Sequence, residues 1–159
     1  MFTTKGEFIQ ALKDYNEVKT KLENLKSEYK NTEYLRFSKV KSSLDYDVAG
    51  YENGEQMRVL KGRSYSSPEQ VVQRNESLDK KLSKLEKSIC DCESRLNQVD
   101  EFLLNFKEPS KSIVIRKYRD SWTYNDLANR FTSVFPVGYP NAVKRYIDCE
   151  LEKAFRKAQ

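Results

Sequence analysis

The chain of 159 residues contains no histidine and only 3 cysteines. Without histidine, imidazole is excluded as a general acid, a general base or a metal ligand. The cysteines are Cys90, Cys92 and Cys149; their spacing makes a poor zinc site, and their odd number fits reduced thiols. No phosphate-binding loop and no nucleophile–base pair is visible. We therefore expect a protein that is not an enzyme and that holds no metal and no cofactor.

Long apolar runs are also missing. No stretch approaches the length of a membrane span, and the N-terminus lacks the apolar segment of a signal peptide. Glycine and proline, at 5 and 4 residues, leave few turns, and 33% charged residues against 38% hydrophobic ones favour extended helices over a large globular core. The sequence thus predicts an all-α, soluble, cytoplasmic protein.

Two long amphipathic helices are predicted in residues 1–106. The first begins near Thr4 and Glu7, a cap-like pair, and continues to about Val40. The second begins at Ser67 and Pro68, a hydroxyl cap followed by proline at the first helical position. Residues 42–67 lack periodicity and are interpreted as a flexible connection.

Apolar residues in both helices recur at spacings of three and four, which is typical of a coiled coil. In the first helix they are Phe8, Leu12, Tyr15, Val18, Leu22, Leu25 and Tyr29. In the second they are Leu78, Leu82, Leu85, Ile89, Cys92, Leu96, Val99, Leu103 and Phe106. The seam is covered by a helical hairpin, by a second copy of the chain, or by both.

Residues 107–159 predict three short helices. Pro109 suits the start of the first, over residues 110–120, and Thr123 with Asp126 forms a capping box for the second. Residues 132–139 contain proline and glycine and predict a turn, after which Pro140 opens the third helix. The predicted core of this unit consists of Trp122, Leu127, Ala128, Phe131, Val143, Ile147, Leu151, Ala154 and Phe155.

Polar residues mark the start of the third helix, on a face different from its apolar one. They are Asn141, Lys144, Arg145 and Asp148. A recognition helix presents such side chains to base edges in the major groove, where asparagine pairs with adenine and arginine with guanine. The alternative is a solvated polar face on an ordinary three-helix bundle. The residues predicted to contact DNA are Tyr139, Asn141, Lys144, Arg145, Asp148, Thr123, Tyr124, Arg130 and Arg119.

Four short strings in this region resemble the helix-turn-helix of the last DNA-binding region of bacterial sigma factors: IRKY at 115–118, WTYNDLA at 122–128, VKR at 143–145 and LEKA at 151–154. More narrowly, they are similar to phage-encoded late-gene transcriptional regulators of the ArpU/RinA type. The resemblance implies a helical, often coiled-coil N-terminal half and a C-terminal helix-turn-helix. One departure is the turn at 132–139, which is longer than the family's and contains Pro136.

The net charge of +5 lies wholly in residues 107–159, which hold 11 basic and 6 acidic residues. This fits phosphate contacts. We therefore divide the chain into a coiled-coil region, 1–106, and a DNA-binding helix-turn-helix domain, 107–159. The first hypothesis is a sequence-specific transcriptional regulator of phage or prophage late genes that binds double-stranded DNA and whose coiled coil forms a homodimer or contacts a partner such as RNA polymerase. The second is a structural or adaptor coiled-coil protein whose basic C-terminal bundle binds protein.

Overall fold

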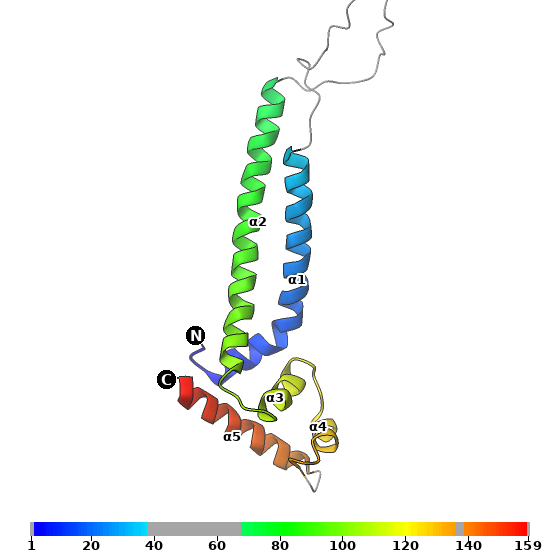
Figure 1. Cartoon of the computed structure of the whole chain (residues 1–159), viewed down its shortest axis with the longest axis vertical. Helices are drawn as coiled ribbons and strands as arrows, with labels where there is room; N and C mark the ends of the chain where they lie inside the picture. The colour runs from blue at the N-terminus through cyan, green and yellow to red at the C-terminus, as the bar shows by residue number, and fades with distance from the viewer. Residues whose placement is uncertain (1, 38–67, 136–138, 159) are drawn as a thin grey trace, which may run out of the picture. The chain divides into compact units, whose positions relative to one another are not determined.

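The computed structural model describes residues 2–37, 68–135 and 139–158, and this part of the chain contains helices and no strand. The helices are α1 (Lys5–Phe37), α2 (Pro68–Leu103), α3 (Ser110–Tyr118), α4 (Tyr124–Arg130) and α5 (Pro140–Ala158). The all-α fold, with a long helical hairpin followed by small helices, is confirmed (Figure 1). No helix in the described ranges has the apolar stretch that a membrane span requires.

Three expectations fall outside the described residues. These are the extension of the first helix from Phe37 to Val40, the interpretation of residues 42–67 as a flexible connection, and the part of the long turn that holds Pro136 and Gly138.

The chain forms two compact units, and each contains part of both long helices. One unit consists of Met1–Asn24 and Ile89–Gln159, and the other of Leu25–Ser88. This division differs from the boundary placed after residue 106 on the sequence. The first turns of α1 and the last turns of α2 belong to the same unit as α3, α4 and α5.

In the unit Leu25–Ser88, the helices of the hairpin are joined by polar contacts at their edges. The Tyr29 hydroxyl donates to Glu86 over 2.8 Å, and the Arg36 guanidinium donates to Asp79 over 2.7 Å. Leu85 is buried in the seam between the helices. Since exposed ion pairs stabilise little, the apolar seam supplies most of the favourable energy.

In the other unit, α1 runs antiparallel to the end of α2. The Tyr15 hydroxyl donates to Asp100, while Phe8, about two turns earlier in α1, packs on Phe102 with ring centroids 4.4 Å apart. Leu12 is fully buried. The hairpin thus buries part of each predicted seam within the chain, while Leu82, Ile89 and Leu96 of the second seam are only partly buried.

Two helix boundaries differ from the sequence prediction by a few residues. α2 ends at Leu103, so Phe106 reaches the core from a turn, in which its backbone N–H donates to the carbonyl of Leu103 over 3.3 Å. α3 begins at Ser110, with Pro109 as its N-cap residue, and ends at Tyr118 instead of residue 120. Such shifts are ordinary, because the last turns of helices fray and tighten.

The three small helices enclose the predicted core. Leu127 and Ala128 of α4 are buried, as is a line along α5 that consists of Val143, Ile147, Leu151 and Ala154. Trp122, Phe131 and Phe155 are only partly buried against this core. The same continuous cluster includes Phe8, Leu12, Val99, Phe102, Leu103, Phe106, Ile113, Val114 and Phe135. The helix-turn-helix thus shares one core with the ends of the hairpin that lie in its unit.

Candidate nucleic-acid interface

The exposed side of α5 carries the polar residues that the sequence singled out. Asn141, Lys144, Arg145 and Asp148 are all exposed, and we call these four the outer face of α5. The line that begins with Val143 and Ile147 is buried, so the apolar side of α5 faces the core and the outer face points away from it. Because residues three and four apart lie on one face of a helix, the buried apolar residues and the exposed polar residues of α5 lie on different faces.

The chemistry of the outer face suits the edges of base pairs. The Asn141 amide can both donate and accept, as adenine requires, and the Arg145 guanidinium presents two donors to guanine. Tyr139 is 66% exposed just before α5, and its carbonyl accepts from the N–H of Ala142 over 3.0 Å. Four of the five predicted contacts near α5 therefore lie on one helix face, and the fifth directly precedes it.

The charge of Asp148, on the outer face of α5, acts on two tyrosines, Tyr118 of α3 and Tyr124 of α4. Burial raises the pKa of Tyr118 to about 12, and Tyr124 and Asp148 add to this shift. Burial also raises the pKa of Tyr124, again with a contribution from the charge of Asp148. The structure thus brings Tyr124, a predicted contact, close to the carboxylate of Asp148.

Thr123 caps the N-terminus of α4. Its hydroxyl accepts from the N–H of Asp126 over 3.1 Å, and its own N–H donates to the Asp126 carboxylate over 3.0 Å. The Thr123 hydroxyl also donates to the Asp126 carboxylate over 2.6 Å, and the two hydrogen bonds that this carboxylate accepts, from the hydroxyl and from the N–H of Thr123, lower the pKa of Asp126. The predicted capping box is confirmed. It places a carboxylate at the first turn of α4, where a phosphate would meet like charge.

The two remaining predicted contacts differ in their surroundings. Arg119 is half-buried; its guanidinium donates to Asp120 over 3.0 Å and lies 5.7 Å from the ring centroid of Tyr15. Arg130 is exposed in the last turn of α4 and lines a shallow depression of about 410 Å³ beside Trp122. Arg119 therefore has structural partners within the protein, while the side chain of Arg130 faces solvent.

Lys117 is not among the predicted contacts, but the structure places it beside Tyr124, which is. Its ammonium lies 3.9 Å from the ring centroid of Tyr124 and donates to the carbonyl of Trp122 over 3.0 Å. The basic run at 116–119 was visible in the sequence. Its contact with Tyr124 depends on the turn between α3 and α4, which periodicity alone does not specify.

A polar network between α3 and α5 was also missed. Ser110, only 4% exposed, donates through Oγ to the Glu150 carboxylate over 2.7 Å, and its Oγ lies 2.8 Å from the hydroxyl of Tyr146. Lys153 donates to the other oxygen of Glu150 over 2.7 Å. Burial disfavours the charged form of Glu150, but the hydrogen bonds from Lys153 and Ser110 outweigh burial and lower its pKa.

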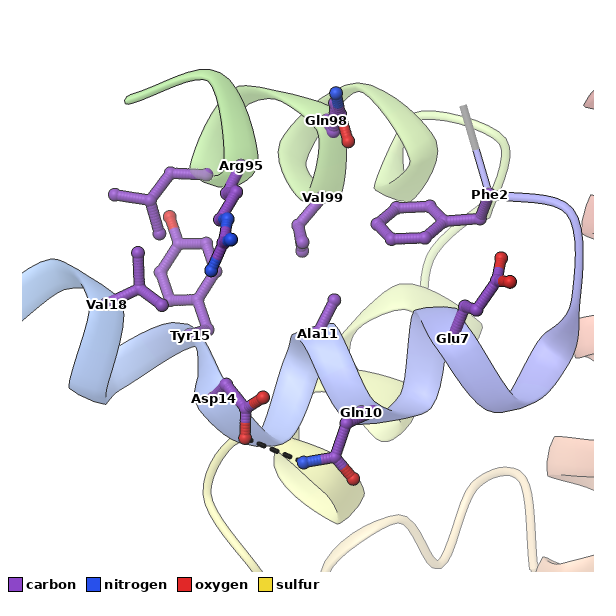
Figure 2. Close-up of a pocket in the computed structure, with 11 residues that line it drawn as sticks. Phe2, Glu7, Gln10, Ala11, Asp14, Tyr15, Val18, Arg95, Gln98 and Val99 are labelled. Atoms are coloured by element: carbon purple, nitrogen blue, oxygen red, sulfur yellow. Dashed lines mark hydrogen bonds between the residues drawn. The ribbon is translucent and has the colours of Figure 1, made fainter. Parts of the chain in front are cut away.

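A groove of about 370 Å³ lies between the first half of α1 and the end of α2 (Figure 2). Phe2, Ala11 and Val99 form apolar walls, and Arg95 reaches over it from α2. Gln10 donates to Asp14 over 2.8 Å on the α1 side. None of the predicted contact residues lines this groove.

No group of three metal-ligating side chains comes together anywhere in the described ranges. Comparison of the chain with protein-family models, with curated proteins and with solved structures gave no match. The resemblance to ArpU/RinA-type regulators and to the sigma-factor helix-turn-helix therefore stays a prediction.

Proposed function

We propose that the protein is a sequence-specific DNA-binding transcriptional regulator that places α5 in the major groove of double-stranded DNA. The observation that carries this proposal is the two-sided character of α5. Ile147 and its apolar neighbours are buried to 1% exposure or less, while Asn141, Lys144 and Arg145 are exposed on the early turns of the helix. Recognition helices read base edges with these early turns.

The distribution of charge supports the same function. Residues 107–159 contain all of the net positive charge of +5. Lys144 and Arg145 lie on the outer face of α5, and Arg130 lies exposed at the end of α4. Cationic groups around a reading helix attract phosphates without regard to sequence, and they make the affinity depend on salt.

The proposal includes a second copy of the chain and RNA polymerase as partners, and control of phage or prophage late genes as the setting, as the resemblance implies. Since α1 already packs along α2 within the chain, a second copy would bind the coiled-coil hairpin as a whole. We call residues 107–159 the head. Two heads linked in a dimer would gain effective concentration on an operator with two half-sites. Light scattering of the full chain, with and without DNA, tests this part.

An adaptor that binds protein is the second candidate. The observation in its favour is a group of large apolar side chains in the unit Leu25–Ser88 that are 47–74% exposed: Tyr34, Leu35, Phe37 and Val72. Exposed apolar groups of this kind often mark sites of protein association. An adaptor would need no sequence preference for DNA.

Selection from a random duplex library with the full-length protein separates the two candidates. Anisotropy titrations then compare the enriched duplex with a scrambled duplex of equal length at several salt concentrations. A regulator binds the enriched duplex at least about a thousandfold more tightly, and log Kd changes steeply with log salt. Equal binding of both duplexes, or no enrichment at all, would contradict the proposal.

A further inference from the structure

The contacts between α5 and α3 are of two kinds. The apolar line along α5 buries surface, which is a favourable but non-directional interaction. Hydrogen bonds, in contrast, depend strongly on distance and angle. The network of Ser110, Tyr146 and Glu150 is therefore the part of this interface that can specify how α5 is rotated and where it sits along its axis.

The direction of the network follows from its donors. Ser110 has one hydroxyl proton, which it donates to the Glu150 carboxylate over 2.7 Å. Hence the Tyr146 hydroxyl must be the donor in its 2.8 Å contact with Ser110 Oγ. The chain of hydrogen bonds runs from Tyr146 through Ser110 to Glu150, and it begins and ends on α5. All buried side-chain N and O atoms in the described residues have a partner.

The network is also tied to the turn before α5. The ring of Phe135, which is 6% exposed, packs edge-on against Tyr146 with centroids 5.3 Å apart. Tyr146 directly follows Arg145, so any rotation of α5 that breaks the Tyr146–Ser110 contact also redirects Arg145. Consecutive residues of an α-helix are separated by a fixed angle.

We infer that Ser110, Tyr146 and Glu150 are positioning residues, which hold α5 at the rotation that aims its outer face at base edges and thereby set the sequence specificity of the protein. This inference rests on the proposed function. The network sets the sequence specificity, and the exposed cations supply the affinity for the DNA backbone. Buried polar contacts of this type can select one arrangement among several of similar stability.

The test uses the full-length chain with Ser110→Ala, which removes the central hydroxyl and leaves all charges unchanged. Affinities for the enriched and the scrambled duplex are measured at a temperature where circular dichroism shows every variant folded. We expect the ratio of the two affinities to fall about tenfold, as the loss of a hydrogen bond to a charged group predicts. Affinity for the scrambled duplex should stay unchanged.

Glu150→Ala and Glu152→Ala form a matched pair. Both remove one negative charge from α5, but Glu152 is exposed and pairs with Lys5 over 2.8 Å. Both should therefore bind the scrambled duplex slightly more tightly, and only Glu150→Ala should lower the specificity ratio. Tyr146→Phe, which keeps the Ser110–Glu150 bond, provides a milder variant if the others unfold. An unchanged ratio in every folded network variant would overturn the inference.

Hydrogen exchange separates failure of the inference from failure of the proposed function. If the wild type shows no sequence preference, the proposed function is wrong, and the exchange of α5 amides alone decides whether the network positions the helix. We expect exchange around residues 144–151 to be about tenfold faster in Ser110→Ala than in Glu152→Ala. Equal rates would show that the apolar line is sufficient to hold α5.

Discussion

At the scale of single residues, Arg145 is the side chain from which we expect the largest contribution to specificity. It is exposed on the outer face of α5, whereas Arg156 is exposed in the last turn of the same helix. Arg145→Ala should cost about 1–3 kcal/mol in binding to the enriched duplex and relax its sequence preference. Arg156→Ala removes a cation far from the early turns of α5, so any loss of affinity should be the same for both duplexes. If both variants lose the same affinity for the enriched and for the scrambled duplex in anisotropy titrations, Arg145 does not contact base edges.

Tyr118 gives a second prediction at this scale. Burial raises its pKa to about 12, above the value of about 10 in an unfolded chain. The unfolded chain thus loses its proton first as the pH rises, so stability is lost between about pH 10 and pH 12. Tyr118→Phe should weaken this alkaline loss of stability in urea unfolding, compared with Tyr34→Phe, whose parent side chain is 74% exposed. If both variants follow the wild-type pH dependence, the Tyr118 hydroxyl is not buried in solution.

At the scale of helices, the first residue of a helix was easier to predict than the side-chain contacts between different helices. Pro68, Thr123 and Pro140 identified the beginnings of three helices, because capping is a local interaction. The buried line of α5 followed from periodicity. The Ser110–Glu150 bond joins residues 40 positions apart, and no local pattern reports such a pairing. Arg119, a predicted contact, lies 5.7 Å from the ring centroid of Tyr15 on α1, and no local pattern reports that neighbour either.

Ile147 tests the packing of α5. Its side chain is 1% exposed in the middle of the buried line, so Ile147→Ala should reduce the free energy of unfolding by about 2–5 kcal/mol. Lys144→Ala, an exposed substitution one turn away on the same helix, should change it by less than about 0.5 kcal/mol. Urea denaturation monitored by circular dichroism measures both. Similar small changes for the two variants would mean that α5 is rotated from the position described.

At the scale of the whole molecule, the packing of α3, α4 and α5 depends on residues distant in the sequence. A boundary after residue 106 follows naturally from the coiled-coil pattern, since Phe106 ends the heptads. The structure instead places Phe8 and Leu12 of α1 in the same core as Val143 of α5. Phe102 contacts Phe155 with ring centroids 4.7 Å apart. Heptad periodicity identifies which residues are buried, but it does not tell what buries them, so the shared core could not be predicted.

The shared core leads to a prediction about which part of the chain folds alone. A fragment of residues 107–159 lacks Phe8, Leu12, Phe102 and Phe106, all 7% exposed or less. Burial of four such side chains contributes about 6–12 kcal/mol, comparable to the net stability of a typical domain, about 5–15 kcal/mol. We therefore expect this fragment to show no cooperative melting transition.

Residues 1–24 joined by a glycine–serine linker to residues 89–159 retain the complete unit. The linker joins neighbouring positions, because the α1 segment that ends at Asn24 runs antiparallel to the α2 segment that begins at Ile89. This chain should melt cooperatively and bind a single half-site of the enriched duplex with the affinity of the full-length protein. A cooperative transition in the 107–159 fragment at the same temperature would show that the hairpin residues add little to the stability of this unit. The boundary after residue 106 would then be correct, and the contacts of Phe8 and Phe102 would be dispensable for the head.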